Sequence, residues 1–223
     1  MLIINWMQKD PVTINSDMTA SRARELFDEL KVPFLPVVDD GKLRGILARR
    51  DIRQAASFVL ASQSVHEMNF FNTRMKVKDL MVRNPITLSV NDTVETALEK
   101  GVNLGRGFFP IMDGDKLAGT ISDRDIFKTF YQLLGVKEKM CGITIEGDDF
   151  TQATGNEIVR TVCSAGASLH SFLMLQEPQT GKKRMVMRLR TSELSAVLAA
   201  LREKGFRIIE AINRSLPTDD PTN

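Results

Sequence analysis

The sequence has few of the residues that build disulfide, metal and catalytic sites. Among its 223 residues are two cysteines, Cys141 and Cys163, and two histidines, His66 and His170. Two cysteines make neither a disulfide framework nor a metal site, so we expect two buried thiols in a reducing cytoplasm. No cluster of histidine, cysteine and carboxylate residues surrounds either histidine, so we expect no metal or catalytic role for them.

Long apolar runs and a strong net charge are also absent from the sequence. No stretch approaches the run of about 18 apolar residues that indicates a membrane span, and the first seven residues lack the basic flank of a signal peptide. The net charge of +2, without a strongly basic helix, provides no general attraction for nucleic acid or a membrane. Because the sequence also has no P-loop and no nucleophile–base pair, we expect a cytoplasmic protein that is not an enzyme and requires no cofactor.

The sequence does contain an internal repeat with a constant offset of 74 positions. Its best-marked segment is Gly45–Asp51, which recurs as Gly119–Asp125. The same offset relates Met7 to Met81, Pro11 to Pro85, Thr13 to Thr87, Thr19 to Thr93, Pro36 to Pro110, Arg50 to Arg124 and Asp51 to Asp125. A gapless repeat of about fifty residues indicates one supersecondary module used twice.

The segment Gly119–Asp125 is typical of a buried strand that runs into a helix starting near Ser122. Free N–H groups at a helix start suit a phosphate, and Ser122, Arg124 and Asp125 add a hydroxyl, a cation and two acceptor oxygens for a ribose. Ser122 and Asp125 also have the spacing of a capping box, which needs no ligand. The first copy has Ala48 in place of the serine but keeps the aspartate, which favours a ligand role for the aspartates.

Hydrophobic periodicity and turn residues predict the order of elements in each copy. In the first copy we expect a helix capped by Ser16 or Asp17, with Ala20, Ala23, Phe27 and Leu30 on its apolar face, then strands 32–39 and 43–48 around a hairpin turn at 39–42, and a helix 49–60. In the second copy we expect a helix capped by Asn91 or Asp92, a hairpin turn at 113–116 and a helix 123–134 ended by Gly135. Between the copies, Val65, Met68 and Phe71 predict a helix that packs between the repeats.

A different pattern begins near residue 139. It predicts, in order, a strand 141–146, a helix 155–165, a strand 169–175, a hairpin loop 176–183, a strand 184–190, a helix capped by Ser192, and a strand 206–212. In the strand 184–190 we expect Met185, Met187 and Leu189 to face the core and the arginines to face solvent. The order βαββαβ is that of a ferredoxin-like fold, so the fold class is α+β. The proline- and aspartate-bearing tail 216–223 is expected to be disordered.

The doubled pattern Met-x-x-x-Pro-x-Thr, Phe-x-Pro-Val/Ile and Gly-x-x-x-x-Arg-Asp resembles a pair of cystathionine-β-synthase (CBS) domains, the Bateman module. The resemblance implies repeats at 1–60 and 77–135, joined by a linker or helix 61–76 and packed sheet on sheet about a pseudo-twofold axis. It also implies two clefts for an adenine nucleotide or a related adenosine-containing ligand. The residues that the resemblance assigns to these clefts are Thr87, Thr93, Gly107, Phe109, Pro110, Ser122, Arg124 and Asp125, with Thr13, Thr19, Pro33, Leu35, Arg50 and Asp51.

Residues 139–215 resemble an ACT domain, a family that binds amino acids and other small effectors at the loop between its first strand and first helix. Here that loop is predicted to be Gly147 to Asn156. A CBS pair followed by an ACT-like domain is similar to the acetoin-utilisation protein B family. This likeness implies a homodimeric regulatory protein that senses adenylates, with or without an amino acid, and acts on an unknown partner protein. The alternative is a ligand-independent scaffold whose CBS clefts are vestigial and whose ACT-like domain only dimerises.

Overall fold

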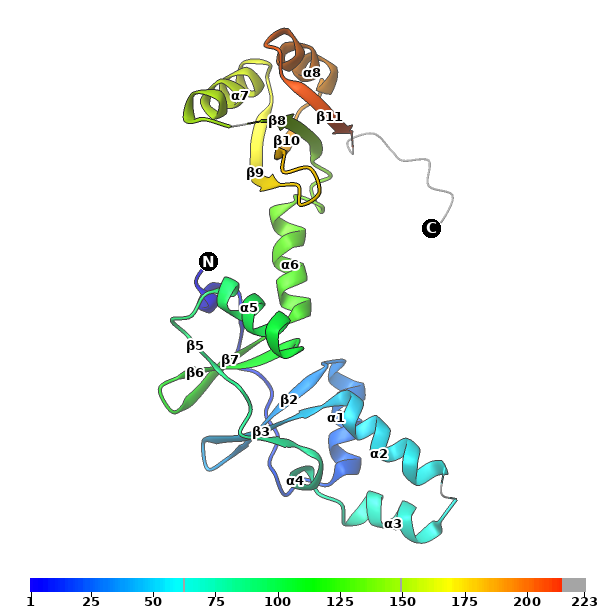
Figure 1. Ribbon diagram of the computed structural model, residues 1–223. Helices are drawn as coiled ribbons and strands as arrows, with labels where there is room; N and C mark the ends of the chain where they lie inside the picture. Colours follow the sequence, from blue (N-terminus) through cyan, green and yellow to red (C-terminus); the bar gives the residue numbers. More distant parts are fainter. Residues whose placement is uncertain (62, 149, 214–223) are drawn as a thin grey trace. The chain divides into compact units, whose positions relative to one another are not determined.

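The computed structural model describes residues 1–61, 63–148 and 150–213, and the chain divides into two compact units (Figure 1). The first unit spans residues 1–127 and the second spans residues 128–223. Each unit is described separately below. The predicted disordered tail 216–223 lies outside the described residues.

The first unit contains the two sequence repeats, and their elements begin at positions 74 residues apart. The first repeat comprises α1 (Ala20–Leu30), β2 (Phe34–Asp39), β3 (Lys42–Ala48) and α2 (Arg49–Ala61). The second comprises α5 (Val94–Leu104), β6 (Phe108–Asp113), β7 (Lys116–Ser122) and α6 (Asp123–Leu133), whose last turns belong to the second unit. Short elements complete the unit: η1 (Ile3–Asn5), β1 (Gln8–Lys9), α3 (Val65–Thr73), α4 (Val77–Leu80), β4 (Val82–Arg83) and β5 (Leu88–Ser89). Both predicted hairpin turns are confirmed.

The helices α1 and α5 begin later than the sequence predicts. Their N-caps are Thr19 and Thr93, whose hydroxyls accept hydrogen bonds from the backbone N–H groups of Arg22 (3.3 Å) and Thr96 (3.2 Å). The predicted caps were therefore wrong in both repeats. Each threonine follows other residues that also cap helices well, so the sequence does not single out the N-cap. In the structure the earlier polar residues stabilise the turn before the helix instead. Asp17 N–H donates to the Asn15 side chain, and the Asp92 carboxylate accepts from Ser89 N–H.

The two repeats exchange their first strands. β1 pairs antiparallel with β7 of the second repeat, and β4 pairs antiparallel with β3 of the first. The exchange extends to backbone hydrogen bonds, because Ala20 N–H donates to the Met75 carbonyl and Val94 N–H donates to the Met1 carbonyl, each at 2.8 Å. Each repeat is therefore completed by a segment that precedes the other repeat in the sequence.

The motif glycines Gly45 and Gly119 permit this exchange. A Cβ atom at Gly119 would lie 2.7 Å from the Gln8 carbonyl oxygen and 2.8 Å from the Met7 sulfur. At Gly45 it would lie 2.6 Å from the Val82 carbonyl oxygen and 2.9 Å from the sulfur of the methionine equivalent to Met7. The glycines thus allow the exchanged strand to approach closely, independently of any ligand.

The pseudo-twofold relation is also seen where Phe34 meets its own counterpart, Phe108. Their rings stack with centroids 4.3 Å apart. Each repeat has its own apolar core, one that includes Phe27 and one that includes Ile121.

Three details of the predicted packing in the first repeat were wrong. Leu30 is exposed, because it is the last residue of α1 and lies outside the core of the first repeat, although Phe27 one turn earlier is buried in it. Val65 is exposed at the start of α3, whereas Phe71 is buried. Phe71 and Met68 pack into the core of the first repeat rather than between the repeats.

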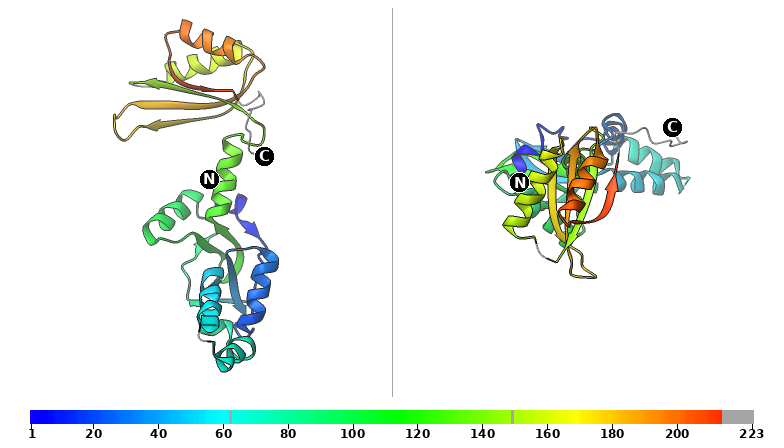
Figure 2. Two further views of the ribbon diagram at one scale, coloured as in Figure 1. Left: turned by 90° about the vertical axis from the view of Figure 1, so that its right-hand side faces the viewer. Right: turned by 90° about the horizontal axis from the view of Figure 1, so that it is seen from above.

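The second unit has the predicted element order βαββαβ. Its elements are β8 (Cys141–Gly147), α7 (Gln152–Ser164), β9 (Ser168–Gln176), β10 (Lys183–Arg190), α8 (Leu194–Glu203) and β11 (Arg207–Ile212). The four strands form an antiparallel sheet in the order β11-β8-β10-β9, with α7 and α8 on one face (Figure 2). Met185, Met187 and Leu189 are buried beneath these helices, which confirms the predicted apolar stripe.

Several local predictions for the second unit need correction. α7 begins at Gln152, capped by the Thr151 hydroxyl, so the loop after β8 is shorter than predicted. The N-cap of α8 is Glu193 rather than Ser192, and it makes no side-chain capping bond. Cys141 is buried as expected, but Cys163 is exposed because it lies on the solvent side of α7.

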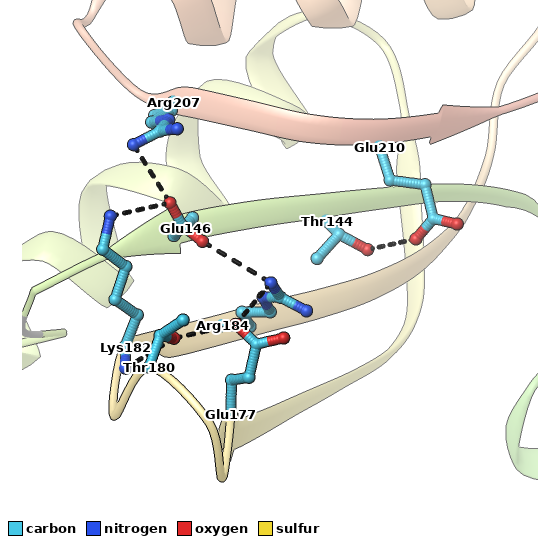
Figure 3. Close-up of polar contacts among 8 residues, drawn as sticks. All are labelled: Thr144, Glu146, Glu177, Thr180, Lys182, Arg184, Arg207 and Glu210. Carbon is cyan, nitrogen blue, oxygen red and sulfur yellow. Dashed lines mark hydrogen bonds and ion pairs between the residues drawn. The ribbon is translucent and has the colours of Figure 1, made fainter.

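The outer face of the sheet carries an ion network centred on Glu146 (Figure 3). The Glu146 side chain is 9% exposed and forms ion pairs with Lys182 (3.3 Å), Arg207 (3.1 Å) and Arg184 (3.7 Å). Arg184 also forms an ion pair with Glu177 at 2.7 Å. Burial acts to raise the pKa of the Glu146 carboxyl, but the three cations together lower it below its usual value. Arg184 was therefore wrongly predicted to be merely solvated.

Candidate functional site

Ser122 and Asp125 form a capping box at the junction of β7 and α6. The Asp125 carboxylate accepts hydrogen bonds from the Ser122 hydroxyl at 2.6 Å and from the Ser122 N–H at 3.0 Å. The Ser122 hydroxyl in turn accepts from the Asp125 N–H at 3.4 Å. Ser122 is buried and Asp125 is half-buried, so the box fixes a negative carboxylate at the start of the helix.

A cleft of about 180 Å³ lies beside this box. Its walls are mainly apolar and come from both repeats, including Pro33 and Leu35 from the first and Phe108 from the second. The strand exchange adds Pro11 to the wall, because β1 and the segment after it reach across to β7. The arrangement offers flat apolar surfaces next to a carboxylate and a hydroxyl.

Thr120 contributes a second hydroxyl to the cleft. The residue is 5% exposed and lines the cleft. Within the described parts of the chain, its hydroxyl makes no side-chain hydrogen bond, in contrast to that of Ser122. This hydroxyl is not fully buried, so a ligand in the cleft can reach it.

The structure brings together only part of the predicted site. Ser122, Asp125, Pro33 and Leu35 all line the cleft described above. The cleft is thus formed by residues of both repeats, and neither repeat forms it alone. Arg124 is exposed on the first turn of α6, outside the residues that line the cleft.

Other predicted residues have structural positions of their own. Thr19 and Thr93 are engaged as helix caps. Phe109 is buried in the core of the second repeat, and it lines, with Gly107, a different cavity on the helical side of the sheet. The remaining predicted residues outside this cleft are the exposed Thr13, the half-buried Thr87 and the buried Pro110.

The corresponding junction in the first repeat is built differently. Ala48 is buried and offers no hydroxyl, and the half-buried Asp51 is contacted by the exposed Arg50 at 3.4 Å. Both copies make the same backbone hydrogen bond here: Arg49 N–H donates to the Pro33 carbonyl and Asp123 N–H donates to the Gly107 carbonyl, both at 2.9 Å.

Sequence reasoning missed several residues of the cleft wall. These are Gln8, Pro11, Val12, Leu30, Val32, Phe34, Pro36, Phe108 and Thr120. Those before residue 13 reach the cleft only through strand exchange, which the repeat pattern does not reveal. Thr120 was detectable in principle, because it is a polar residue in a strand segment otherwise expected to be buried.

Among the described residues, no group of three or more histidine, cysteine or carboxylate side chains is placed to hold a metal ion. Within the same residues, no helix has both the length and the apolar character needed to span a membrane.

The family model for the CBS domain matches residues 3–57 and 77–131. A CBS domain-containing protein of Dictyostelium discoideum is 31% identical over 139 residues, which cover 60% of this chain and 94% of that protein. An uncharacterized protein of Methanocaldococcus jannaschii is 31% identical over 122 residues, or 54% of this chain, and the chain spans 36% of its length. The inosine-5'-monophosphate dehydrogenase of Korarchaeum cryptofilum is 27% identical over 124 residues, only 23% of that enzyme. Relatives thus include both a stand-alone CBS protein and a CBS region of an enzyme.

Among solved structures, one assigned to an acetoin utilization protein (AcuB) of Vibrio cholerae matches with a TM-score of 0.51 and 22% identity. The match covers 62% of this chain and 96% of that one, and it supports the fold of the CBS pair. A structure of CBSX2 in complex with AMP matches with a TM-score of 0.49 and 22% identity over 59% of this chain and 96% of that one, a likeness too weak to assign a ligand here. From the matched repeats and the near-complete coverage of the Dictyostelium relative, the chain belongs to the family of CBS-domain proteins.

Proposed function

We propose that the cleft beside Ser122 and Asp125 binds an adenosine-containing ligand and that the protein is a non-enzymatic sensor of that ligand. The observation that carries this proposal is the composition of the cleft: a fixed carboxylate and the Thr120 hydroxyl, which makes no side-chain hydrogen bond in the described residues, lie beside apolar walls. A carboxylate suits the two ribose hydroxyls, and a flat aromatic or proline surface suits a purine ring. Adenosyl ligands in such clefts are also what membership of the CBS family implies.

The charges around the cleft favour recognition of the nucleoside part of the ligand. The described wall carries the Asp125 carboxylate but no lysine or arginine. A phosphate is therefore expected to extend toward the exposed Arg124 and the start of α6, where N–H groups and the helix dipole favour negative charge. The walls hold the nucleoside, so AMP, ADP, ATP and S-adenosylmethionine remain candidate ligands.

Because the cleft is shared by the two repeats, a ligand there contacts both. Binding would change the balance between arrangements of the repeats only by its difference in affinity for them. The competing function is a ligand-independent scaffold. The observation that favours it is that the capping box already engages Asp125 and that Ala48 removes the corresponding hydroxyl from the first repeat.

We propose that the second unit is an ACT-type domain that dimerises the chain. β9 is at the edge of its sheet, and four consecutive large apolar side chains on it are exposed by 42–58%: Phe172, Leu173, Met174 and Leu175. Pairing this strand with the same strand of a second copy would satisfy its free edge and cover these side chains. Leu173→Lys is expected to convert a dimer into a monomer in sedimentation; an unchanged dimer would contradict this assignment.

An amino acid or another small effector is proposed for the same domain. A cavity of about 230 Å³ lies next to the loop after β8, lined by Phe150 of that loop and by Met174, Leu175, Gln176 and Lys183. This is the loop at which the ACT resemblance places effectors.

Thermal unfolding with AMP, ADP, ATP, NAD and S-adenosylmethionine tests the sensor proposal. A ligand at about 100 times its Kd stabilises the native state by about 2.7 kcal/mol. The stabilisation should be lost in Asp125→Ala and retained in Asp51→Ala. Asp125→Ala also removes half of a capping box, at a cost of about 1 kcal/mol, so each variant is compared with its own ligand-free form. If none of these compounds stabilises wild-type protein that has first been freed of bound ligand, the result favours the ligand-independent scaffold.

A further inference from the structure

The two repeats differ at one core position in a way that leaves a cavity. Phe27 of α1 is 1% exposed and fills the core of the first repeat. The equivalent position on α5, 74 residues later, is Gly101. A benzyl group present in one copy is thus absent from the other.

A cavity of about 170 Å³ lies at this place in the second repeat. Its inner wall is formed by the buried side chains of Ala97, Phe109 and Ile121, together with Gly101. Phe109 is larger than Leu35, its counterpart in the first repeat. It comes within 3.9 Å of where a Cβ of Gly101 would lie, so it fills part of the volume that the missing Phe27 ring would take.

The cavity also changes the exposure of a neighbouring core residue. Ile52 in the first repeat is fully buried, whereas its counterpart Ile126 is only half-buried and lines the cavity. An apolar cavity of about 150 Å³ is large enough to hold a benzene ring. In the first repeat the equivalent space holds the aromatic ring of Phe27.

The rim of the cavity carries both signs of charge. Arg106 and Asp123 are both exposed there. In the first repeat the position of Asp123 is taken by Arg49, whose guanidinium lies 5.9 Å from the centre of the Phe27 ring. The second repeat therefore has space for an aromatic ring and, at the rim of that space, one acidic and one basic side chain that suit a zwitterion. The first repeat instead has an arginine near the face of its own Phe27 ring.

We propose that this cavity is a second ligand site and that it binds a free aromatic α-amino acid. The ring occupies the part of the equivalent Phe27 space that Phe109 leaves open, the ammonium group faces Asp123, and the carboxylate faces Arg106. The site shares Ser122 with the cleft proposed above for an adenosine-containing ligand (the adenosyl cleft), but its other lining residues differ. It shares no residue with the cavity proposed for an effector in the second unit.

Saturation-transfer NMR on the full chain with L-phenylalanine tests this proposal. Toluene, 2-phenylethylamine and 3-phenylpropionate are titrated in parallel, because they keep the ring and remove one or both charges. Ala97→Leu places a larger side chain in the cavity. Arg106→Gln and Asp123→Asn change exposed residues, and they keep the test decisive if Ala97→Leu does not fold. Arg53→Gln, an exposed arginine on α2, is the matched control.

The expected result is saturable binding of L-phenylalanine in the millimolar range, abolished by Ala97→Leu and weakened about tenfold by Arg106→Gln or Asp123→Asn. The three analogues should bind more weakly, and Arg53→Gln should bind like the wild type. Thr120→Val, which alters only the adenosyl cleft, should also leave this binding unchanged. Absence of saturation, tighter binding of toluene than of the amino acid, or equal binding by the wild type, Arg106→Gln and Asp123→Asn would overturn the proposal.

Discussion

Replacing Gly119 by alanine should disrupt the strand exchange that builds the cleft. The new Cβ would lie 2.7 Å from the Gln8 carbonyl oxygen, about 0.7 Å short of ordinary van der Waals contact. Because that atom belongs to the backbone of β1, side-chain rotation cannot relieve the clash. β1 must move, and with it Pro11, which lines the cleft.

Overpacking of this kind costs about 1–3 kcal/mol, and the reduced freedom of the unfolded chain returns less than about 1 kcal/mol. For a unit of this size the expected loss in Tm is roughly 3–10 °C. Trp6 is the only tryptophan and packs against the core of the second repeat, so its fluorescence follows unfolding of the first unit. Gly45→Ala should give a similar loss, because it makes the equivalent clash in the first repeat.

Gly155→Ala is the control for the general effect of a methyl group. It lies inside α7, and nothing approaches its Cβ position within 4 Å, so alanine should be neutral or stabilising by up to about 1 kcal/mol. Because α7 belongs to the second unit, unfolding of this variant is followed by circular dichroism of the full chain rather than by Trp6 fluorescence. If Gly119→Ala and Gly45→Ala unfold at or above the wild-type temperature, close strand approach is not what requires these glycines, and our account of the exchange is wrong.

Three further predictions concern the cleft, the pseudo-twofold contact and the ion network. Thr120→Val should keep stability within about 0.5 kcal/mol and weaken the adenosyl ligand about five- to tenfold in calorimetry; unchanged affinity would remove this hydroxyl from the site. A double-mutant cycle of Phe34→Leu and Phe108→Leu should give a coupling of about 0.5–1.5 kcal/mol in urea unfolding, and additive effects would contradict the stacking. Because the folded-state pKa of Glu146 is lowered, its stabilisation is present above the unfolded pKa and lost as pH falls through the folded pKa. Glu146→Gln should therefore flatten the acid limb of stability between about pH 5 and pH 3 in circular dichroism, and an identical acid limb would refute the network's role.

Much of the fold could be predicted because the sequence repeats itself and its turns are clearly marked. The constant offset identified two copies of one module, and the Asp-Asp-Gly and Asp-Gly-Asp segments located both hairpins. Alternation of Met185, Met187 and Leu189 with polar residues identified a strand with one buried face. These signals depend on residues close together in the sequence, and tertiary packing did not change the elements that they predict.

The exact helix starts and the composition of the cleft could not be predicted in the same way. Consecutive capping residues before α1 and α5 leave several positions equally suitable, and only the backbone path chose Thr19 and Thr93. The cleft depends on which strand pairs with which repeat, a long-range choice that no local pattern encodes. Gly119 could have indicated a close approach of another backbone segment, since a glycine within a strand often marks one. It could not have indicated which strand approaches.

The most direct test of the central claim is photolabelling of the full chain with 8-azido-AMP, followed by identification of the labelled peptides. Our account predicts labelling of the segment around Pro33–Pro36, of the segment around Phe108, or of both, because these residues form the apolar walls of one cleft. The labelling should be prevented by excess AMP and abolished in Asp125→Ala. Labelling confined to the second unit, or labelling that Asp125→Ala leaves intact, would contradict the claim that an adenosine-containing ligand binds between the repeats.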